Sequence, residues 1–243
     1  MNLQVKKVDN KKDVKNIHSG HRQRMREKAY KNGFDSFEQH ELLEMLLYAT
    51  VPQKDTNPIA HNLINSFGSF HAVFEAPVEE LMKVSGMTKT SAFLLKMIPE
   101  ISSEYLYDKV SGENNYIKTS DEADNYIAPK YIGKSNVIIY VLFMNTAGKL
   151  ISFEMLDKGS LNFANIDSRK LVSLCLKHNA AGIIICHNHP SGNATPSSND
   201  MITTKNIRIC VNSISVKLLD HLIITDKGYT SMREMKQYEN LFN

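Results

Sequence analysis

Residues 181–186, AGIIIC, form a short apolar run that ends abruptly in the polar stretch HNHPSGNATPSSND. A run of this length, rich in β-branched residues and followed by turn-forming residues, is typical of a strand buried inside a sheet. The sequence therefore predicts a buried strand with several polar side chains at its carboxyl end.

Further strands and helices alternate around this run. Strand-like apolar runs lie at residues 136–145, 149–156 and 216–225. Segments with helical spacing of apolar residues lie at 120–128, 167–178 and about 197–211. We expect Ser120 to cap the first of these helices and Asp167 the second. Strands that alternate with helices predict an α/β domain over residues 119–243.

The first hundred residues show only helical patterns. From Gln39 onward, leucines at three- and four-residue spacing fall on one helix face. The polar stretch DKVSGENNYIK then has no periodicity and predicts a linker at 109–118. We thus expect a mixed α and β protein: an all-helical domain at 18–108 followed by the α/β domain. Residues 1–17 are polar and predict a flexible basic arm.

The net charge of +3 is unevenly distributed along the chain. Residues 1–34 contain ten Lys or Arg and three Asp or Glu, whereas the remaining residues are slightly acidic. This arm either steers the protein toward a polyanion or is a solvated tail. No apolar run approaches the ~20 residues that span a bilayer, and the N-terminus lacks the apolar core of a signal peptide. We therefore expect a cytoplasmic protein without a membrane partner.

Two histidines, His187 and His189, directly follow the predicted strand at 181–186. Residues two apart in an extended chain project to the same side, so both imidazoles can face one point. The following loop can fold back and bring Asp200 to that point. Two imidazole nitrogens and one carboxylate oxygen, with a fourth position left to water, form a common catalytic Zn²⁺ site. The alternative is a pair of loop histidines that bind nothing.

Ser197 lies three residues before Asp200, where the predicted helix begins. In one interpretation its hydroxyl lies near the metal carboxylate and stabilises the oxyanion formed when water attacks a carbonyl. In the other, Ser197 only caps the helix. The sequence by itself leaves both roles open.

The spacing His187-x-His189, seven residues, Ser197, two residues, Asp200 resembles the JAMM (MPN⁺) metalloprotease signature. The fuller string HNHPSG…TPSSND is similar to the RadC family in particular. RQRMREKAYKNGFDSFEQHELLEMLL near the N-terminus and LDHLII at 219–224 also resemble RadC sequences, so the likeness covers nearly the whole chain. The resemblance implies a JAMM fold, a cytidine-deaminase-like α/β arrangement. It also implies zinc bound by the two histidines and Asp200, with Ser197 assisting the oxyanion.

Asp220 and His221 also match the RadC pattern. On this resemblance, Asp220 orients one of the metal ligands through a hydrogen bond. The alternative is that an Asp-His pair in an apolar strand has a purely structural role.

One departure from the pattern concerns the general base. JAMM hydrolases use an upstream glutamate as general acid and base. In RadC-like sequences it precedes the central strand, and here that position aligns with Val137, or with Ile138 if the alignment shifts by one. Neither side chain can accept a proton, and loss of a general base costs on the order of 10²–10⁴ in rate. The carboxylates nearby in the sequence are Asp121, Glu122, Asp124 and Glu154.

A second departure lies in LMKVSGMTKTSA at 81–92, which resembles a helix-hairpin-helix. Such a hairpin binds a DNA phosphate through backbone N–H groups and a helix N-terminus, without reading bases. Its usual turn is Gly-hydrophobic-Gly, but here Gly86 is followed by Met and then Thr88, whose Cβ blocks a close approach. Lys83 and Lys89 leave some positive charge. The alternative is a hairpin that only packs.

Two functions remain open at this point. The first is a zinc-dependent hydrolase that cleaves a peptide or isopeptide bond in a protein substrate. The second is a DNA-associated accessory protein, in a repair or recombination context, whose metal domain is not catalytic. The complete His-His-Ser-Asp set favours the first function, and the missing glutamate favours the second. The sequence leaves the oligomeric state open.

Overall fold

The computed structural model describes residues 20–52, 54–112, 115–158 and 166–242, so the arm expected at 1–17 lies outside the described residues. Contacts within the chain group it into two compact units, Met1–Ile98 and Pro99–Asn243. This division falls inside helix α7 (Lys89–Val110), earlier in the chain than the expected linker at 109–118.

The first unit is helical. Its elements are α2 (His21–Asn32), α3 (Gln39–Leu47), α4 (Asn57–Phe67), α5 (Phe70–Glu75), α6 (Val78–Leu81) and the first part of α7. Leu43 and Leu47 of α3 are fully buried against Leu63 of α4 and Leu95 of α7. The leucines whose spacing predicted α3 thus lie in the centre of this core.

The second unit is the expected α/β domain. Its helices are α8 (Ser120–Ile127), η1 (Ala128–Tyr131), α9 (Ser168–Lys177), α10 (Ser198–Asn212) and η3 (Glu239–Leu241). Its strands are β1 (Ile138–Met144), β2 (Leu150–Lys158), β3 (Gly182–Asn188), β4 (Lys217–Thr225) and β5 (Gly228–Ser231). The strand order is β2-β1-β3-β4-β5, with β3 and β4 parallel and the other neighbours antiparallel. The short edge strand β5 was not expected from the sequence.

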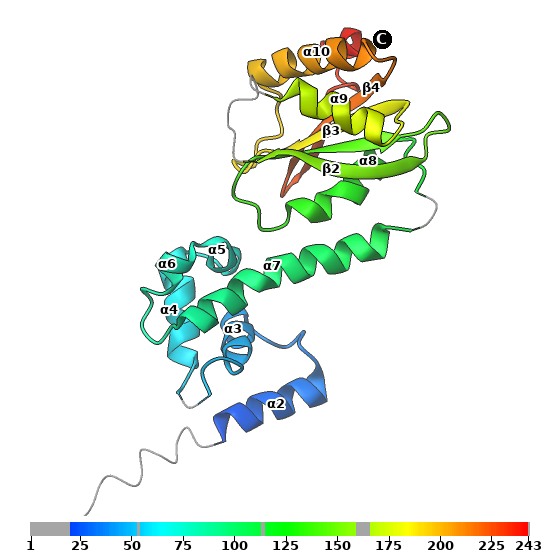
Figure 1. Cartoon of the computed structure of the whole chain (residues 1–243). Helices are drawn as coiled ribbons and strands as arrows, with labels where there is room; N and C mark the ends of the chain where they lie inside the picture. Colours follow the sequence, from blue (N-terminus) through cyan, green and yellow to red (C-terminus); the bar gives the residue numbers. More distant parts are fainter. Residues whose placement is uncertain (1–19, 53, 113–114, 159–165, 243) are drawn as a thin grey trace, which may run out of the picture. The chain divides into compact units, whose positions relative to one another are not determined.

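Helices cover both faces of this sheet (Figure 1). Ile183 and Ile185 of β3 pack in one core with Leu171 of α9 and Ile207 of α10. Cys186 packs in a second core on the opposite face, with Ile127 of α8. Because successive strand residues alternate between faces, the next residue of β3 points back toward α10.

The N-cap expected for α8 is wrong by one residue. Thr119, not Ser120, caps the helix: its side chain accepts a hydrogen bond from the Glu122 N–H, and the Glu122 carboxylate accepts one from the Thr119 N–H. This reciprocal pair needs an acidic residue three positions after the cap, and Thr119 has that spacing. Ser120 is thereby free of the capping role, and its hydroxyl oxygen lies 2.7 Å from the Glu234 Oε1 atom and 3.1 Å from the Asp220 Oδ2 atom.

The second half of α7 belongs to the α/β unit through its side-chain contacts. The hydroxyl groups of Tyr107 and Tyr126 are 2.7 Å apart, and the Tyr107 ring packs against Phe153 of β2. Lys130 forms an ion pair with Glu104 at 2.8 Å and lies over the Tyr107 ring. These contacts explain why the division falls within the helix rather than after it.

Candidate metal centre

Three predicted ligands converge at the carboxyl end of β3. His187 is the next-to-last residue of this strand. Its side chain faces α10, on the same face as Ile183 and Ile185. His189 follows the strand, and its N–H still donates to the Ile224 carbonyl, so the chain stays extended. Asp200 is in the first turn of α10. Strand alternation and the position of α10 therefore bring all three side chains together.

The distances within this group suit a shared ion. The Nε2 atoms of His187 and His189 are 2.9 Å apart. Asp200 places Oδ1 3.3 Å from the His187 Nε2 atom and Oδ2 3.6 Å from the His189 Nε2 atom. One ligand atom from each residue lies within 4.8 Å of the other two. The His189 side chain is 18% exposed and the other two are fully buried, so the group opens to solvent only on the His189 side.

The hydrogen bonds of His189 and Asp200 leave electron pairs directed inward. The Nδ1 atom of His189 lies 2.7 Å from the Asn193 carbonyl, which can only accept, so Nδ1 holds a proton and neutral His189 presents a lone pair at Nε2. The Asp200 Oδ1 atom is buried and accepts no hydrogen bond within the described residues. A buried carboxylate oxygen without a donor, beside two imidazole nitrogens, fits a divalent cation. The group could therefore hold a metal ion.

The electrostatics favour a cation in the same way. Burial, followed by the neighbouring His221, holds the pKa of His187 well below its usual value, so this ring is neutral. The Asp200 carboxylate, whose Oδ2 atom lies 3.6 Å from the His189 Nε2 atom, raises the pKa of His189, so it favours a positive charge at that nitrogen. Burial alone would raise the pKa of Asp200, but the nearby His189 and His187 rings and the hydrogen bonds from Ser197 together lower it. Asp200 is thus an ionised carboxylate inside the protein.

Ser197 caps α10 and orients Asp200. Its hydroxyl donates to the Asp200 Oδ2 atom at 2.7 Å, its N–H donates to the same oxygen at 2.7 Å, and the Asp200 N–H donates back to the hydroxyl oxygen at 3.2 Å. Both donors engage Oδ2, so Oδ1 is left to face His187. The capping interpretation is therefore confirmed, and the oxyanion role remains a prediction.

Asp220 lies on the face of β4 that points away from His187, His189 and Asp200, which we call the metal group. Its carboxylate accepts hydrogen bonds from the Ser231 hydroxyl at 2.6 Å and from the N–H groups of His221 and Arg233 at 2.7 and 3.1 Å. Together with the bond from Ser120, these join β4, β5 and α8. Among the described residues Asp220 reaches a ligand only indirectly, because the side chain that contacts His187 is that of His221.

Two residues in this network were missed as contributors from the sequence. The His221 Nε2 atom lies 2.8 Å from the His187 Nδ1 atom, and the His221 Nδ1 atom lies 2.6 Å from the Thr204 hydroxyl. That hydroxyl also donates to the Asp200 carbonyl at 2.6 Å. The position of Thr204, four residues after Asp200 on a helix, was the available signal for its proximity.

The structure distinguishes between the two positions aligned with the missing glutamate. Ile139 of β1 pairs with His187, and Val137 packs in the same core as Ile139, on the α10 face. Ile138 packs in the opposite core. Val137, 5% exposed, is therefore the position on the side of the metal group, and it supplies only methyl groups there.

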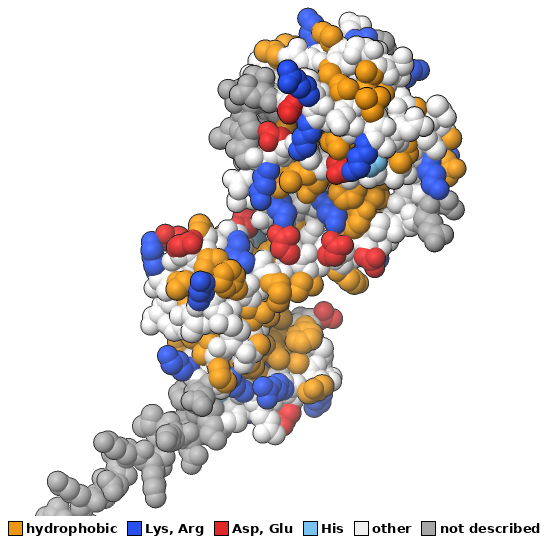
Figure 2. Space-filling model, in the orientation of Figure 1, with side chains coloured by type: hydrophobic (Ala, Val, Ile, Leu, Met, Phe, Trp, Pro, Cys, Tyr) orange, Lys and Arg blue, Asp and Glu red, His pale blue; other side chains and the backbone are white. Residues whose placement is uncertain are grey.

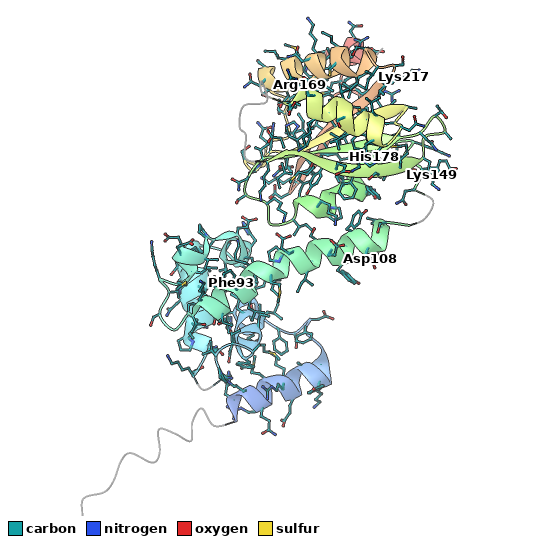
Figure 3. All side chains as sticks on the ribbon, viewed as in Figure 1. Phe93, Asp108, Lys149, Arg169, His178 and Lys217 are labelled. Carbon is teal, nitrogen blue, oxygen red and sulfur yellow. The ribbon has the colours of Figure 1, made fainter. Side chains whose placement is uncertain are left out.

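The other acidic residues considered have partners elsewhere. Glu122 completes the cap of α8, Asp121 accepts from the Tyr229 hydroxyl, and Asp124 lies on α8, which covers the opposite face. Glu154 pairs with Lys177 at 2.7 Å and with His178, labelled in Figure 3, at 3.0 Å. Segment 159–165, outside the described residues, contains no Asp or Glu.

The hairpin before α7 contains the four residues expected for phosphate binding. Gly86 has a φ of 91°, and the Thr88 hydroxyl accepts from the Ser91 N–H at 3.1 Å, which caps α7. Lys83 forms an ion pair with Glu80 at 2.5 Å, and Lys89 lies over the Phe93 ring. At the position of the second glycine of a helix-hairpin-helix turn, Thr88 thus caps α7 with its side chain.

Known proteins match both units. Residues 117–238 match the RadC-like JAB domain, and residues 17–93 match the UPF0758 N-terminal domain. A UPF0758 protein of Fusobacterium nucleatum subsp. nucleatum is 34% identical over 221 residues, which cover 88% of this chain and 95% of that protein. A UPF0758 protein of Bacillus pumilus is 30% identical over 219 residues (89% and 96%). One of Pseudomonas fluorescens is 31% identical over 212 residues (87% and 94%).

The fold and the buried His-His-Asp group define a protein with a JAB-type domain, joined to an N-terminal helical unit. The chain belongs to the RadC family, whose relatives here are named UPF0758 proteins. The resemblance seen in the sequence is thereby confirmed. Within the described part of the chain, no helix has both the length and the apolar character needed to cross a bilayer.

Proposed function

We propose that the RadC-like domain binds Zn²⁺ through His187, His189 and Asp200 and hydrolyses a peptide or isopeptide bond. This proposal depends on one observation: two imidazole nitrogens and a carboxylate oxygen converge on one point. The carboxylate oxygen, Asp200 Oδ1, is buried and accepts no hydrogen bond within the described residues. Two imidazoles and one carboxylate are typical of zinc rather than of magnesium or calcium sites. Three protein ligands leave a coordination position open.

Zinc in this position would polarise a substrate carbonyl and lower the pKa of a bound water molecule. The residues of the chain supply the remaining functions. Substrate approaches from the His189 side, because only that ligand is partly exposed. Ser197 is exposed beside it, and its hydroxyl can rotate from Asp200 to donate to the carbonyl oxygen of the substrate.

Metal stoichiometry tests the first half of this proposal. Wild-type protein reconstituted with Zn²⁺ and passed through a desalting column should retain one zinc per chain by elemental analysis. His187→Ala should lose it, whereas His71→Ala, an exposed histidine in the helical unit, should not. Equal zinc content in wild-type protein and in His187→Ala would refute the site.

Hydrolysis tests the second half. Zinc-loaded wild-type protein should cleave an isopeptide-linked fluorogenic peptide above the buffer rate, and Ser197→Ala should reduce kcat more than it changes zinc content. Because Val137 offers no proton acceptor, we expect a rate about 10²–10⁴ below that of an enzyme with a general base. A zinc-loaded protein without any cleavage would leave the metal site standing and overturn the hydrolase assignment.

Val137 favours one alternative function, a DNA-associated protein whose metal domain does not catalyse. Val137 has no proton acceptor at the position that aligns with the general base of JAMM hydrolases, and the helical unit has the Gly86–Thr88 turn at the start of α7. Figure 2 shows Lys and Arg side chains at several places on the visible face of this unit, where they can contact phosphates.

Salt-dependent DNA binding tests this alternative. If it holds, a labelled duplex should bind at low salt with an affinity that falls steeply from 50 to 200 mM salt. Lys89→Ala should weaken binding of all sequences about equally and lower the salt slope by about one. Lys217→Ala, on β4 (Figure 3), serves as the charge-matched control. Undetectable binding at low salt would exclude the alternative.

A further inference from the structure

A chain of three hydrogen bonds runs from the backbone of one predicted ligand to the ring of another. It begins at the Asp200 carbonyl, passes through the Thr204 hydroxyl and the His221 imidazole, and ends at the His187 Nδ1 atom. The three distances are 2.6, 2.6 and 2.8 Å. His187, His221 and Thr204 are all completely buried, so solvent does not compete for these bonds.

The direction of each bond follows from which atoms can donate. A carbonyl oxygen has no proton, so the single hydroxyl proton of Thr204 lies between it and the Asp200 carbonyl. The Thr204 oxygen can then only accept from His221, which places a proton on the His221 Nδ1 atom. The His221 ring is completely buried and neither of its nitrogens contacts a carboxylate, so nothing beside it would stabilise a charge and the ring is neutral. Its Nε2 atom therefore carries no proton and can only accept a hydrogen bond.

The last bond determines the state of the ligand itself. Since the His221 Nε2 atom can only accept, the proton between the two rings belongs to the His187 Nδ1 atom. A neutral His187 then presents an unprotonated Nε2 atom toward His189 and Asp200. The opposite tautomer of His187 would place a proton where a metal ion must bind.

We infer that Thr204 and His221 are positioning residues that hold His187 in the Nδ1-protonated tautomer and so direct its Nε2 lone pair to the metal. The inference rests on the metal site proposed above. The chain also links two ligands, because Asp200 supplies its carboxylate to the ion and its carbonyl to the residue that orients His187. A shift of α10 would therefore disturb both ligands together.

The tautomers are read directly by NMR of the full-length protein labelled with ¹⁵N-histidine, without metal and after addition of Zn²⁺. Two-bond ¹H–¹⁵N correlations should show His187 and His221 as neutral rings protonated at Nδ1 in the metal-free protein. An Nε2-protonated His187 would overturn the inference. This measurement needs neither a variant nor a bound metal, so it decides the tautomer by itself. Wild-type protein that binds no zinc would refute the proposed function and the metal-directing role, but not the tautomer assignment.

Matched variants test the consequence for metal binding. Thr204→Val keeps the shape but removes the hydroxyl, and it should weaken zinc affinity about 10–100-fold. Thr204→Ser keeps the hydroxyl and should bind as wild type does. His221→Gln retains an acceptor near the position of Nε2 and should bind zinc more tightly than His221→Met. The Co²⁺ absorption spectrum should change in Thr204→Val and not in Thr204→Ser. Equal zinc affinity and equal Co²⁺ spectra for Thr204→Val and Thr204→Ser would overturn the role; if Thr204→Val fails to fold, the wild-type tautomers decide.

Discussion

Ile139 of β1 lies directly opposite His187 of β3 in the antiparallel register. Val137, two residues before Ile139, therefore lies on the same face of the sheet. Because the two strands are antiparallel, it lies nearer than Ile139 to the carboxyl end of β3, where His189 follows. Both valine methyl groups belong to the core that α9 and α10 cover. A glutamate at position 137, directly before β1, would extend from this face toward the carboxyl end of β3, whereas valine offers no proton acceptor.

Val137→Glu should therefore create or increase hydrolysis. The new carboxylate would accept a proton from water at the metal group, and general-base catalysis contributes about 10²–10⁴ in rate. Cleavage of the isopeptide-linked fluorogenic peptide by the zinc-loaded variant measures the effect. Val137→Gln is the control, because glutamine has the shape of glutamate but cannot accept the proton. This variant should stay at the wild-type rate. If both variants have the same rate, position 137 does not host the base.

Asp200→Asn should abolish stabilisation by zinc while leaving α10 capped. The amide oxygen can still accept from the Ser197 N–H, but the charge that attracts the cation is lost. Zinc at about 100 times its Kd should raise the Tm of the wild-type protein by about 5–10 °C. Asp167→Asn makes the matching change at the cap of α9, away from the histidines, and should retain the full shift. A zinc-dependent shift in Asp200→Asn would show that the carboxylate is not a ligand.

Asp124 should make the protein less stable as pH rises from 4 to 6. Burial, together with the nearby Asp121, raises the pKa of Asp124 to about 6, and its Oδ1 atom is buried without a hydrogen-bond partner among the described residues. An aspartate in the unfolded chain has a pKa of about 3.9, so in this window the folded state binds more protons than the unfolded state. Stability is therefore lost as pH rises toward 6.

Asp124→Asn should remove this dependence. The variant should equal the wild type near pH 4 and exceed it at pH 7 by about 1 kcal/mol, a figure reduced for the partial solvent exposure of the carboxyl group. Denaturant titrations across pH measure it, with Asp108→Asn at an exposed position of α7 (Figure 3) as the control. Parallel pH profiles for wild-type and Asp124→Asn protein would contradict the assignment.

Gly86→Ala should destabilise the helical unit. Gly86 has a φ of 91°, and an added Cβ would lie 2.6 Å from the Cδ1 atom of Ile59, a buried residue of α4. The unfavourable backbone conformation and the displaced Ile59 together should cost about 2–4 kcal/mol. At Gly33, φ is 70° and nothing lies within 4 Å of an added Cβ, so Gly33→Ala should cost only the backbone part, about 1–2 kcal/mol. Denaturant unfolding of the full chain compares the two variants, and equal losses would show that the contact with Ile59 is unimportant.

Local patterns were sufficient for most of the elements. The apolar run at 181–186 and its neighbours appear as β1, β2, β3 and β4, and Asp167 and Ser197 cap the helices that follow them. The strand β5 was missed because its four residues have no apolar periodicity. Ser120 is not the cap of α8, because Thr119 has the acidic residue Glu122 three positions later and forms the reciprocal pair with it.

The sequence by itself determined that His187 and His189 face the same side, because they lie two residues apart in an extended chain, and that Asp200 lies in the first turn of a capped helix. The docking of α10 on the sheet then brings Asp200 to the histidines. Only the tertiary structure decided which of Asp220 and His221 faces the metal group. Alternation shows that neighbours on β4 point to opposite faces, but packing of β4 beside β3 selects the face for each. The bond from His221 to His187 spans 34 residues. No local pattern encodes such a contact, because sheet register and helix docking are set by burial over the whole domain.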